Sequence, residues 1–385
     1  MRHAAHRPDR SRHATMLNRA SILATLHLAA TTAAATPYVL VPDTSNGIIT
    51  AFRQSNGAQI LVENKPPGLW LDLAMFIDSG SLGILRHAAQ VGSEIWISDQ
   101  LNGIVHRVSA EFETPRYLGF IDSVPNPRGV GTSNAEAWIA SGSIGPSGGL
   151  ARFTFNGQPL GSFDADDPFD FMPLGTGFLT ANIFNNRLDF FSAAGVFQNV
   201  WSATSTLDFP LQITSRTTGS GTEIVVAGNA DPQPGLYRFD AASGAFLGRT
   251  LTIAFLPFIT VTQPRGTAVL GTGELLWSST QGVFAVNPGT GISRTLYTGE
   301  NFVCNMADTV DFSWFCQGDL NNDAFVDDSD FSAFAIAYDL LLCPQLSNGF
   351  PAGCPADLNG DGFVDDADFT YFARAYDKLL CPLSP

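Results

Sequence analysis

The sequence predicts a mainly β protein, with strand repeats over residues 36–315 and a small all-α unit over residues 316–385. A loose unit of 40 to 56 residues recurs through the first part, and a second unit occurs twice in the last part, 38 residues apart. Composition agrees with this division. The 37 Gly and 30 Phe accompany only 15% charged residues, a balance that favours short strands and turns.

The long repeat joins an apolar strand to a second strand through a polar turn. Its two clearest copies, YVLVPDTSNGIITAF from Tyr38 and IWISDQLNGIVHRV from Ile95, share a D-x-x-N-G turn. Looser copies begin at Ala137, Phe178, Ile224 and Leu275. A unit of this length with about four short strands is typical of a β-propeller blade. Six copies therefore predict a six-bladed β-propeller over residues 36–315.

Segments with Pro and Gly precede several copies, namely Pro66-Pro67-Gly68, Pro127-Arg128-Gly129 and Pro264-Arg265-Gly266. With the D-x-x-N turn after a strand, this pattern resembles NHL-type and related six-bladed propellers. Residues 301–315 are expected to supply strands that close the ring with the first blade near Tyr38. A pair of β-sandwiches is the alternative, although neither Ig-like Cys nor Trp spacing supports it.

The short repeat places oxygen-bearing side chains at a metal-ligand spacing. Its copies, aligned from Cys316 and Cys354, share 20 of 29 positions. Calcium takes roughly six to eight oxygen ligands, which a twelve-residue loop supplies from positions 1, 3, 5, 7, 9 and 12. We therefore expect two Ca²⁺ sites. Their ligands are Asp319, Asn321, Asp323, the carbonyl of Phe325, Asp327 and Asp330 in the first loop, and Asp357, Asn359, Asp361, the carbonyl of Phe363, Asp365 and Asp368 in the second.

The two loops differ at position 6, where the backbone must turn sharply. Gly362 meets this need in the second loop, whereas Ala324 occupies the position in the first. Because a positive φ costs an Ala about 1 kcal/mol, the second site is predicted to bind Ca²⁺ more tightly. An acidic tail without metal is the alternative interpretation.

After each loop, apolar residues recur with a helical period. The aspartate at position 12 is expected to start each helix and to cap its free N–H groups. Since neither helix has a partner helix within its own repeat, the two stripes should pack against each other. The stripes are Phe331, Phe334, Ala335, Tyr338 and Leu342, and Phe369, Phe372, Ala373, Tyr376 and Leu380.

Residues 317–383 resemble the dockerin family, paired calcium-binding modules that attach secreted proteins to cohesin receptors. The resemblance rests on D-x-N-x-D-G-x-V-x-x-x-D, complete in the second copy and nearly so in the first. It implies a cohesin-like or other surface protein as partner. Cysteines at both ends of each repeat depart from the clostridial pattern and look more like dockerin-like tails of environmental bacteria.

The amino terminus predicts export. A basic stretch ends at Arg19, an apolar run follows over residues 20–30, and small residues precede Thr36, so residues 1–35 read as a signal peptide. The apolar run is too short for a membrane span, and we find no second candidate. The protein is therefore expected to be secreted or associated with a bacterial cell surface.

Export permits disulfide bonds. A bond within one repeat would span a helix of roughly 18 Å, well beyond the usual limit of about 7 Å between Cα atoms. Antiparallel packing of the two units instead favours the pairs Cys316–Cys381 and Cys343–Cys354. Cys304 lies outside this repeat and is expected to be a buried thiol.

The formal charge of −16 is concentrated at the carboxyl end, where residues 316–385 carry twelve Asp against Arg374 and Lys378, a balance of −10. Nucleic acid is excluded as a partner by this surface charge. The ring instead is expected to bind a glycan or a protein.

No catalytic residue is predicted in the ring. Ser147 matches G-x-S-x-G only within a Gly- and Pro-rich turn, without the strand-to-helix elbow that such a nucleophile needs. Asp43, Asp99, Asn182 and Asn229 occupy similar positions and either line one mouth of the ring or stabilise turns. The tryptophans at 70, 96, 138, 201 and 277 form either a sugar-binding surface or core.

We therefore expect a secreted scaffold that a calcium-binding dockerin-like module attaches to another protein. The alternative is an enzyme, a hydrolase of polysaccharide catabolism or a lactone-cleaving propeller, delivered to a complex by the same module. Some six-bladed lactonases hold a catalytic Ca²⁺ at the mouth of the ring, which is where Asp43 and Asp99 would act.

Overall fold

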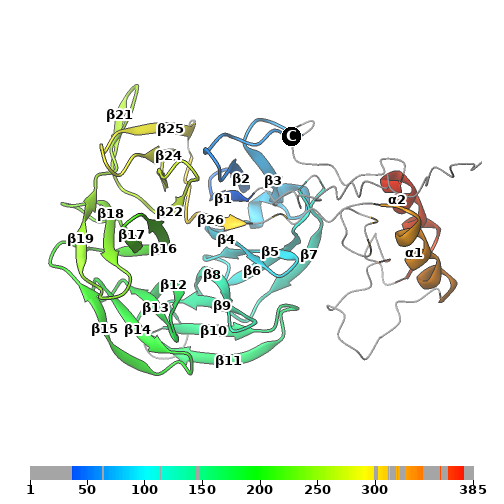
Figure 1. Ribbon diagram of the computed structural model, residues 1–385, viewed down its shortest axis with the longest axis horizontal. Helices are drawn as coiled ribbons and strands as arrows, with labels where there is room; N and C mark the ends of the chain where they lie inside the picture. The colour runs from blue at the N-terminus through cyan, green and yellow to red at the C-terminus, as the bar shows by residue number, and fades with distance from the viewer. Residues whose placement is uncertain are drawn as a thin grey trace, which may run out of the picture. The chain divides into compact units, whose positions relative to one another are not determined.

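The computed structural model describes residues 37–62, 65–112, 114–143, 148–298, 302–310, 312, 318, 320, 326–340, 356 and 363–376. Within these residues the protein is mainly β, and six four-stranded antiparallel sheets form the blades of a propeller (Figure 1). The six-bladed ring predicted from the repeats is confirmed.

Each blade pairs its strands in spatial order from the centre outward. The first blade is β26 (Asp308–Val310), β1 (Tyr38–Asp43), β2 (Ile48–Arg53) and β3 (Leu69–Asp72). The second is β4 (Leu85–Val91), β5 (Glu94–Asp99), β6 (Ile104–Ser109) and β7 (Tyr117–Ile121). The third is β8 (Pro127–Ser133), β9 (Glu136–Ser141), β10 (Gly149–Phe153) and β11 (Pro159–Asp164).

The other three blades repeat this order. The fourth is β12 (Pro168–Leu174), β13 (Gly177–Asn182), β14 (Arg187–Ser192) and β15 (Phe197–Ala203). The fifth is β16 (Pro210–Thr218), β17 (Gly221–Gly228), β18 (Gly235–Asp240) and β19 (Phe246–Thr250). The sixth is β22 (Gly266–Val269), β23 (Leu275–Ser279), β24 (Gly282–Val286) and β25 (Ser293–Thr298). Short elements join them: η1 (Leu73–Met75), η2 (Ser79–Ser81) and the hairpin of β20 (Ala254–Leu256) with β21 (Ile259–Val261).

The second strand of each blade is the one that the repeat marked. Its residues form near-continuous apolar runs because neighbouring blades cover both faces of it. All six residues of β1 and all five of β23 are buried. Trp96, Trp138 and Trp277 lie on such strands and are at most 1% exposed. The hydrophobic core of the ring therefore consists of layers of side chains packed between adjacent blades.

The ring is closed by the end of the domain pairing with its beginning. β26 is antiparallel to β1, with Tyr38 opposite Val310, and Asp43 forms an isolated bridge with Cys304. This closure removes the free edge that an open sheet would present. The prediction that residues 301–315 complete the first blade is confirmed for the part that the structure describes, and Cys304 is a fully buried free thiol.

A repeated ion pair ties the second strand of several blades to its neighbour. Glu94 binds Arg107 at 2.6 Å and also accepts a hydrogen bond from the indole of Trp96. Glu136 binds Arg152 at 2.6 Å and accepts from Trp138 in the same way. Because each glutamate satisfies the indole N–H as well as the guanidinium, these pairs contribute to blade geometry as well as to charge balance.

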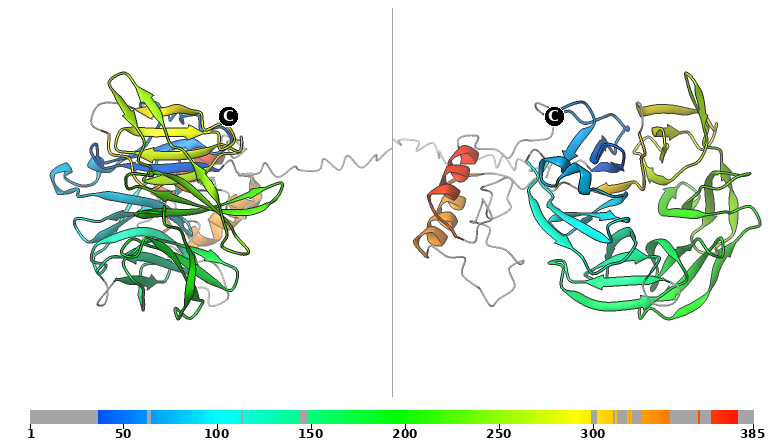
Figure 2. Two further views of the ribbon diagram at one scale, coloured as in Figure 1. Left: turned by 90° about the vertical axis from the view of Figure 1, so that its left-hand side faces the viewer. Right: turned by 180° about the vertical axis from the view of Figure 1, so that it is seen from behind.

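The carboxyl-terminal part contains two helices, α1 (Asp328–Leu340) and α2 (Asp366–Tyr376), which lie side by side (Figure 2). Phe334 stacks on Phe372 with ring centroids 5.0 Å apart, and both side chains are 1% exposed. The expected pairing of the two aromatic stripes is thus confirmed at its centre. Each helix begins at loop position 10, two residues before the aspartate expected to start it.

Candidate functional site

The described acidic residues of the two tail loops have matching environments. Asp330 Oδ2 accepts a hydrogen bond from the backbone N–H of Asp327 at 3.0 Å, and Asp368 Oδ2 accepts from Asp365 at 3.0 Å. Both carboxylates at position 12 are fully buried. In each repeat, the aspartate at position 12 is therefore hydrogen-bonded to the residue immediately before the helix.

This arrangement is a capping box. Asp327 lies at the N-cap and accepts from the N–H of Ser329 at 2.8 Å, while the Asp330 carboxylate reaches back to the N-cap N–H. A second backbone donor, the N–H of Leu320, reaches Asp330 Oδ1 at 2.7 Å. The bonds orient the carboxylate of Asp330 between the loop and the helix.

The two loop–helix units are related by approximate twofold symmetry. The Phe331–Phe372 and Phe334–Phe369 ring pairs have the same centroid distance, 6.0 Å, and the same interplanar angle, 44°. Tyr338 donates to Asp366 Oδ1, and its repeat partner Tyr376 donates to Asp328 Oδ1. A duplicated sequence here gives a duplicated contact.

The described donors fit calcium in kind, because they are carboxylates placed at loop positions 9 and 12. Within the described residues there is no group of three or more His, Cys, Asp or Glu that could hold a metal ion. The predicted ligands Asp319, Asn321, Asp323, Phe325, Asp357, Asn359 and Asp361 lie outside the described residues. So do Cys316, Cys343, Cys354 and Cys381, Ser147 and residues 1–35, which were predicted to be a signal peptide.

Asp43 and Asp99, the acids considered for the mouth of the ring, stabilise turns. Asp43 is fully buried and accepts from the N–H of Ser45 at 3.1 Å, the amide of Asn46 at 2.8 Å and the N–H of Val303 at 3.1 Å. Asp99 is also fully buried and accepts from Gly83 N–H at 2.9 Å and from the Asn102 amide at 2.8 Å. Their oxygens serve the backbone and leave the turn interpretation as the better one.

Asn182 and Asn229 have similar roles. The amide of Asn182 donates to Asp189 Oδ2 at 2.7 Å and its carbonyl accepts from Asn185 N–H at 2.9 Å, while the amide of Asn229 donates to the carbonyl of Pro264 at 3.1 Å. Trp70 is fully buried, like the tryptophans of the second strands. The four polar positions, Asp43, Asp99, Asn182 and Asn229, thus stabilise turns and contacts between segments of the ring.

At the centre of the ring, side chains of the inner strands bond to the backbone of the next inner strand. His87 Nδ1 on β4 accepts from Val130 N–H on β8 at 2.9 Å. Asp170 Oδ2 on β12 accepts from Ile213 N–H on β16 at 2.9 Å, and Gln212 Oε1 accepts from Thr267 N–H at 2.8 Å. These bonds join neighbouring blades around the axis, the second to the third, the fourth to the fifth and the fifth to the sixth, and sequence analysis did not identify them.

The central layer also holds titratable groups with shifted pKa values. Burial raises the pKa of Asp170 to about 8 and lowers the pKa of His87 to about 3. Asp308 is 37% exposed, but the surrounding protein still raises its pKa to about 7 by desolvation. Its Oδ2 lies 3.9 Å from His87 Nε2, which has no hydrogen-bond partner among the described residues. Desolvation in this layer thus disfavours the charged form of each of these three groups.

Above this layer, three arginines begin or precede inner strands, Arg86 on β4, Arg128 on β8 and Arg265 before β22. Two of them, Arg128 and Arg265, are the central residues of the two Pro-Arg-Gly segments of the sequence. Convergence of residues so far apart in the chain is visible only in the closed ring. The recurrence of Pro-Arg-Gly was the available signal.

A separate groove of about 380 Å³ lies between the third and fourth blades. Its lining includes Thr132, Ser133, Asn134, Phe155, Thr176 and Ala193. The lining residues carry no titratable side chain, so the groove offers hydroxyl and amide hydrogen bonds and apolar contact.

No protein-family model matches the chain, and no curated protein sequence matches it. Among solved structures, it is similar to a chain of the nidogen/laminin complex, at 11% identity and a TM-score of 0.52, over 71% of this chain and 98% of that chain. It also matches Kuenenia stuttgartiensis hydrazine synthase, at 14% identity and a TM-score of 0.40, over 61% of this chain and 66% of that chain. A third match is a catalytically inactive virginiamycin B lyase from Staphylococcus aureus with quinupristin, at 12% identity and a TM-score of 0.44, over 69% and 85%.

The likeness to the chain from the nidogen/laminin complex supports the propeller fold, and at 11% identity it supports nothing beyond the fold. The class of protein that the structure defines is a six-bladed β-propeller with a pair of helices near its carboxyl end. Of the helices that the structure describes, none is long and apolar enough to cross a membrane.

Proposed function

We propose that this protein is an exported scaffold whose carboxyl-terminal loop–helix pair binds two Ca²⁺ ions and docks onto a cohesin-like or other surface protein. One observation carries the proposal, the twofold repetition of the buried position-12 carboxylates and of the aromatic contacts between them. A general acidic tail has no need of two acids held in the same geometry at the same loop position.

Charge supports a role for a cation. Residues 316–385 carry twelve Asp against two basic residues, and clustered carboxylates repel one another when they ionise. Calcium ions bound among them offset this repulsion, so that metal binding stabilises the folded helix pair. The aspartates at positions 9 and 12 would hold the ion from the helix side of each loop.

The first test is calorimetric titration of Ca²⁺ into the full-length protein and into Asp330→Ala/Asp368→Ala. We expect two ions per chain for the parent protein and loss of both sites in the double variant. Asp339→Ala is the matched control, since it removes an exposed carboxylate of α1 outside the loop and should bind both ions. Absence of heat from the parent protein, or unchanged binding by the double variant, would reject the calcium module.

The partner is tested separately with a recombinant cohesin module. We expect capture of the full-length protein in millimolar Ca²⁺ and release in chelator. If Ca²⁺ binds as expected but no cohesin module captures the protein, the cohesin-like partner is rejected while the metal site stands.

The enzyme alternative has less support from the residues first considered for it. Asp43 and Asp99 are fully buried and bonded to backbone N–H groups, which leaves them poorly placed to touch a substrate. A screen of the protein against glycans and lactones examines this alternative directly. Turnover abolished by Asp99→Asn in a stably folded variant would revive it.

A further inference from the structure

Three guanidinium groups gather at the face of the ring where the inner strands begin, which we call the top face. Arg86 Nη1 and Arg265 Nη1 both donate to one acceptor, Asn305 Oδ1, at 3.0 and 2.8 Å. Arg128 faces the same group across Phe169, whose ring lies 5.1 Å from the Arg128 guanidinium carbon and 5.8 Å from that of Arg86. Three blades and the closing segment thus contribute to one cluster.

The positive charge of this cluster is not balanced. Arg128 forms an ion pair with Asp167 at 2.7 Å. Among the described residues, neither Arg86 nor Arg265 has a carboxylate within 4.0 Å. Their shared acceptor is Asn305, which is neutral where an aspartate would have supplied the missing charge.

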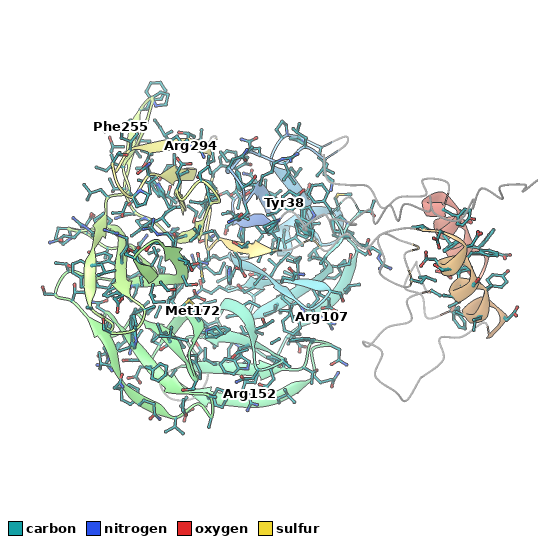
Figure 3. The ribbon with its side chains drawn as sticks, viewed as in Figure 1. Tyr38, Arg107, Arg152, Met172, Phe255 and Arg294 are labelled. Carbon is teal, nitrogen blue, oxygen red and sulfur yellow. The ribbon has the colours of Figure 1, made fainter. Side chains whose placement is uncertain are left out.

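Arginines at the periphery are different. Arg107, Arg152 and Arg294 (Figure 3) lie on the third and fourth strands of their blades, and each is paired with a glutamate at 2.6 to 2.7 Å. These three outer arginines are thus neutralised by a glutamate, whereas Arg86 and Arg265 at the centre have no carboxylate partner among the described residues. Buried or half-buried charges are normally paired because desolvation is costly.

Burial in this cluster shifts the pKa values of both arginines. Burial, together with the charges of Arg265 and Arg128, lowers the pKa of Arg86 to about 10, and burial also lowers the pKa of Arg265. Asp170 and Asp308 of the central layer offer little compensation, because desolvation raises their pKa values to about 8 and 7 and so disfavours their charged forms. A bound anion would supply the compensation that the described residues do not provide.

The donors suit a carboxylate. A guanidinium has five N–H donors in a planar fork that matches two carboxylate oxygens, and Arg265 uses one of them within the described residues. Phosphate sites typically use backbone N–H groups at helix amino termini or in glycine-rich nests. In the described ring the only helices are two 3₁₀ turns of three residues each, so side-chain forks are the main donors here.

The geometry points to a further binding site: we propose that Arg86 and Arg265, with Arg128 beside them, bind the carboxylate of a small organic acid at the top face of the ring. Sugar acids belong to this class of ligand. The site is independent of the calcium module, so that either can fail without the other.

The test measures thermal unfolding and calorimetric binding of the full-length protein with sodium acetate, sodium D-glucuronate, sodium phosphate and glucose as probes, in a buffer without other carboxylates. Glucuronate should raise Tm and bind with a measurable Kd, acetate should do so more weakly, and glucose should have no effect. Phosphate binding without carboxylate binding would overturn the ligand class.

Variants locate the site. Gln100 Oε1 accepts from Arg86 Nε, so Gln100→Glu places an internal carboxylate beside the unpaired charge and should weaken glucuronate binding at least tenfold without loss of fold. Arg265→Gln should do the same by removing the charge. Arg294→Gln is the control, because Arg294 is a peripheral, paired arginine. Binding to Gln100→Glu and Arg265→Gln at parent strength, or no response to any carboxylate, would overturn the proposal.

Discussion

The tail and the ring are both built by repetition, but they use it in opposite ways. In the tail, the two copies keep the same side chains, and Phe334 and Phe372 meet across an approximate twofold axis with their aspartates in matching positions. In the ring, the copies keep the strands but change the side chains at the axis. The residue after the first position of each inner strand is Arg86, Arg128, Phe169 or Leu211 in the second to fifth blades.

The difference shows how each region makes a site. Near-identical copies produce two similar sites, each made by its own repeat and repeated by symmetry. Diversified copies produce one asymmetric site, because each blade contributes a single, different side chain to a shared axis. Charge follows the same division: the tail concentrates carboxylates, for which we propose Ca²⁺ as the counterion, and the top face of the ring concentrates arginines, for which we propose a carboxylate ligand.

The largest expected effect is on the pH dependence of stability, through Asp170. Its pKa is raised to about 8 in the folded protein, against an ordinary value of 3.8. The stability it contributes is therefore fully present below pH 3.8 and is lost as pH rises through about 8. Over this range the change is on the order of 5 kcal/mol.

Asp170→Asn keeps an oxygen to accept from Ile213 N–H and cannot ionise. We expect calorimetry to show the variant more stable than the parent protein at pH 8, with a smaller difference at pH 5. Asp122→Asn, at an exposed position, is the control and should follow the parent at both pH values. Parallel pH profiles for Asp170→Asn and the parent would contradict the raised pKa.

The next effect concerns the twofold contact of the tail. Phe334→Ala removes a side chain that is 1% exposed and stacked on Phe372, a loss of about 3–5 kcal/mol. Because folding and metal binding are coupled in the proposed function, Ca²⁺ affinity in calorimetric titration should fall strongly. Ile336→Ala, at a site on the same helix that is 66% exposed, should leave affinity unchanged. Equal Ca²⁺ affinities of Phe334→Ala and Ile336→Ala would show that metal binding does not depend on the packing of the two helices.

A smaller effect is expected at the turn of the second blade. Burial alone would raise the pKa of Asp99, but the imidazole of His106, with Nε2 3.6 Å from Asp99 Oδ2, and hydrogen bonds from Gly83 N–H and Asn102 outweigh it and lower the pKa. Asp99→Ala leaves these donors unpaired and should cost about 2–3 kcal/mol in urea unfolding near neutral pH. Asp99→Asn should cost less, since it retains one acceptor. If both variants unfold like the parent, Asp99 has a role other than holding the turn.

The smallest effect tests the inequality of the two loops. Ala324→Gly relieves the positive φ expected at loop position 6, worth about 1 kcal/mol, and should tighten the weaker Ca²⁺ site about fivefold in a calorimetric titration. Gly362→Ala should weaken the stronger site by a similar factor. If neither variant changes the Ca²⁺ affinity of either loop, the residue at position 6 does not determine the difference between the two sites.

Sequence by itself predicted the elements that local pattern controls. The six apolar runs from Tyr38 to Leu275 mark the second strand of every blade, because burial between two blades demands an apolar strand wherever it occurs. The helical spacing in the tail likewise predicted that Phe334 and Phe372 would meet. Dockerin-like identity, Ca²⁺ binding, export and the disulfide pairs remain predictions.

Only the tertiary structure decided what lies at the axis. Arg86 and Arg265 are 179 positions apart in the chain, and nothing local to either predicts that both donate to Asn305. The same holds for Asp170, whose pKa depends on burial among strands from other blades. Strand and turn formation depends on residues that are neighbours in the sequence. Charge balance at the centre depends on which residues the closed ring brings together.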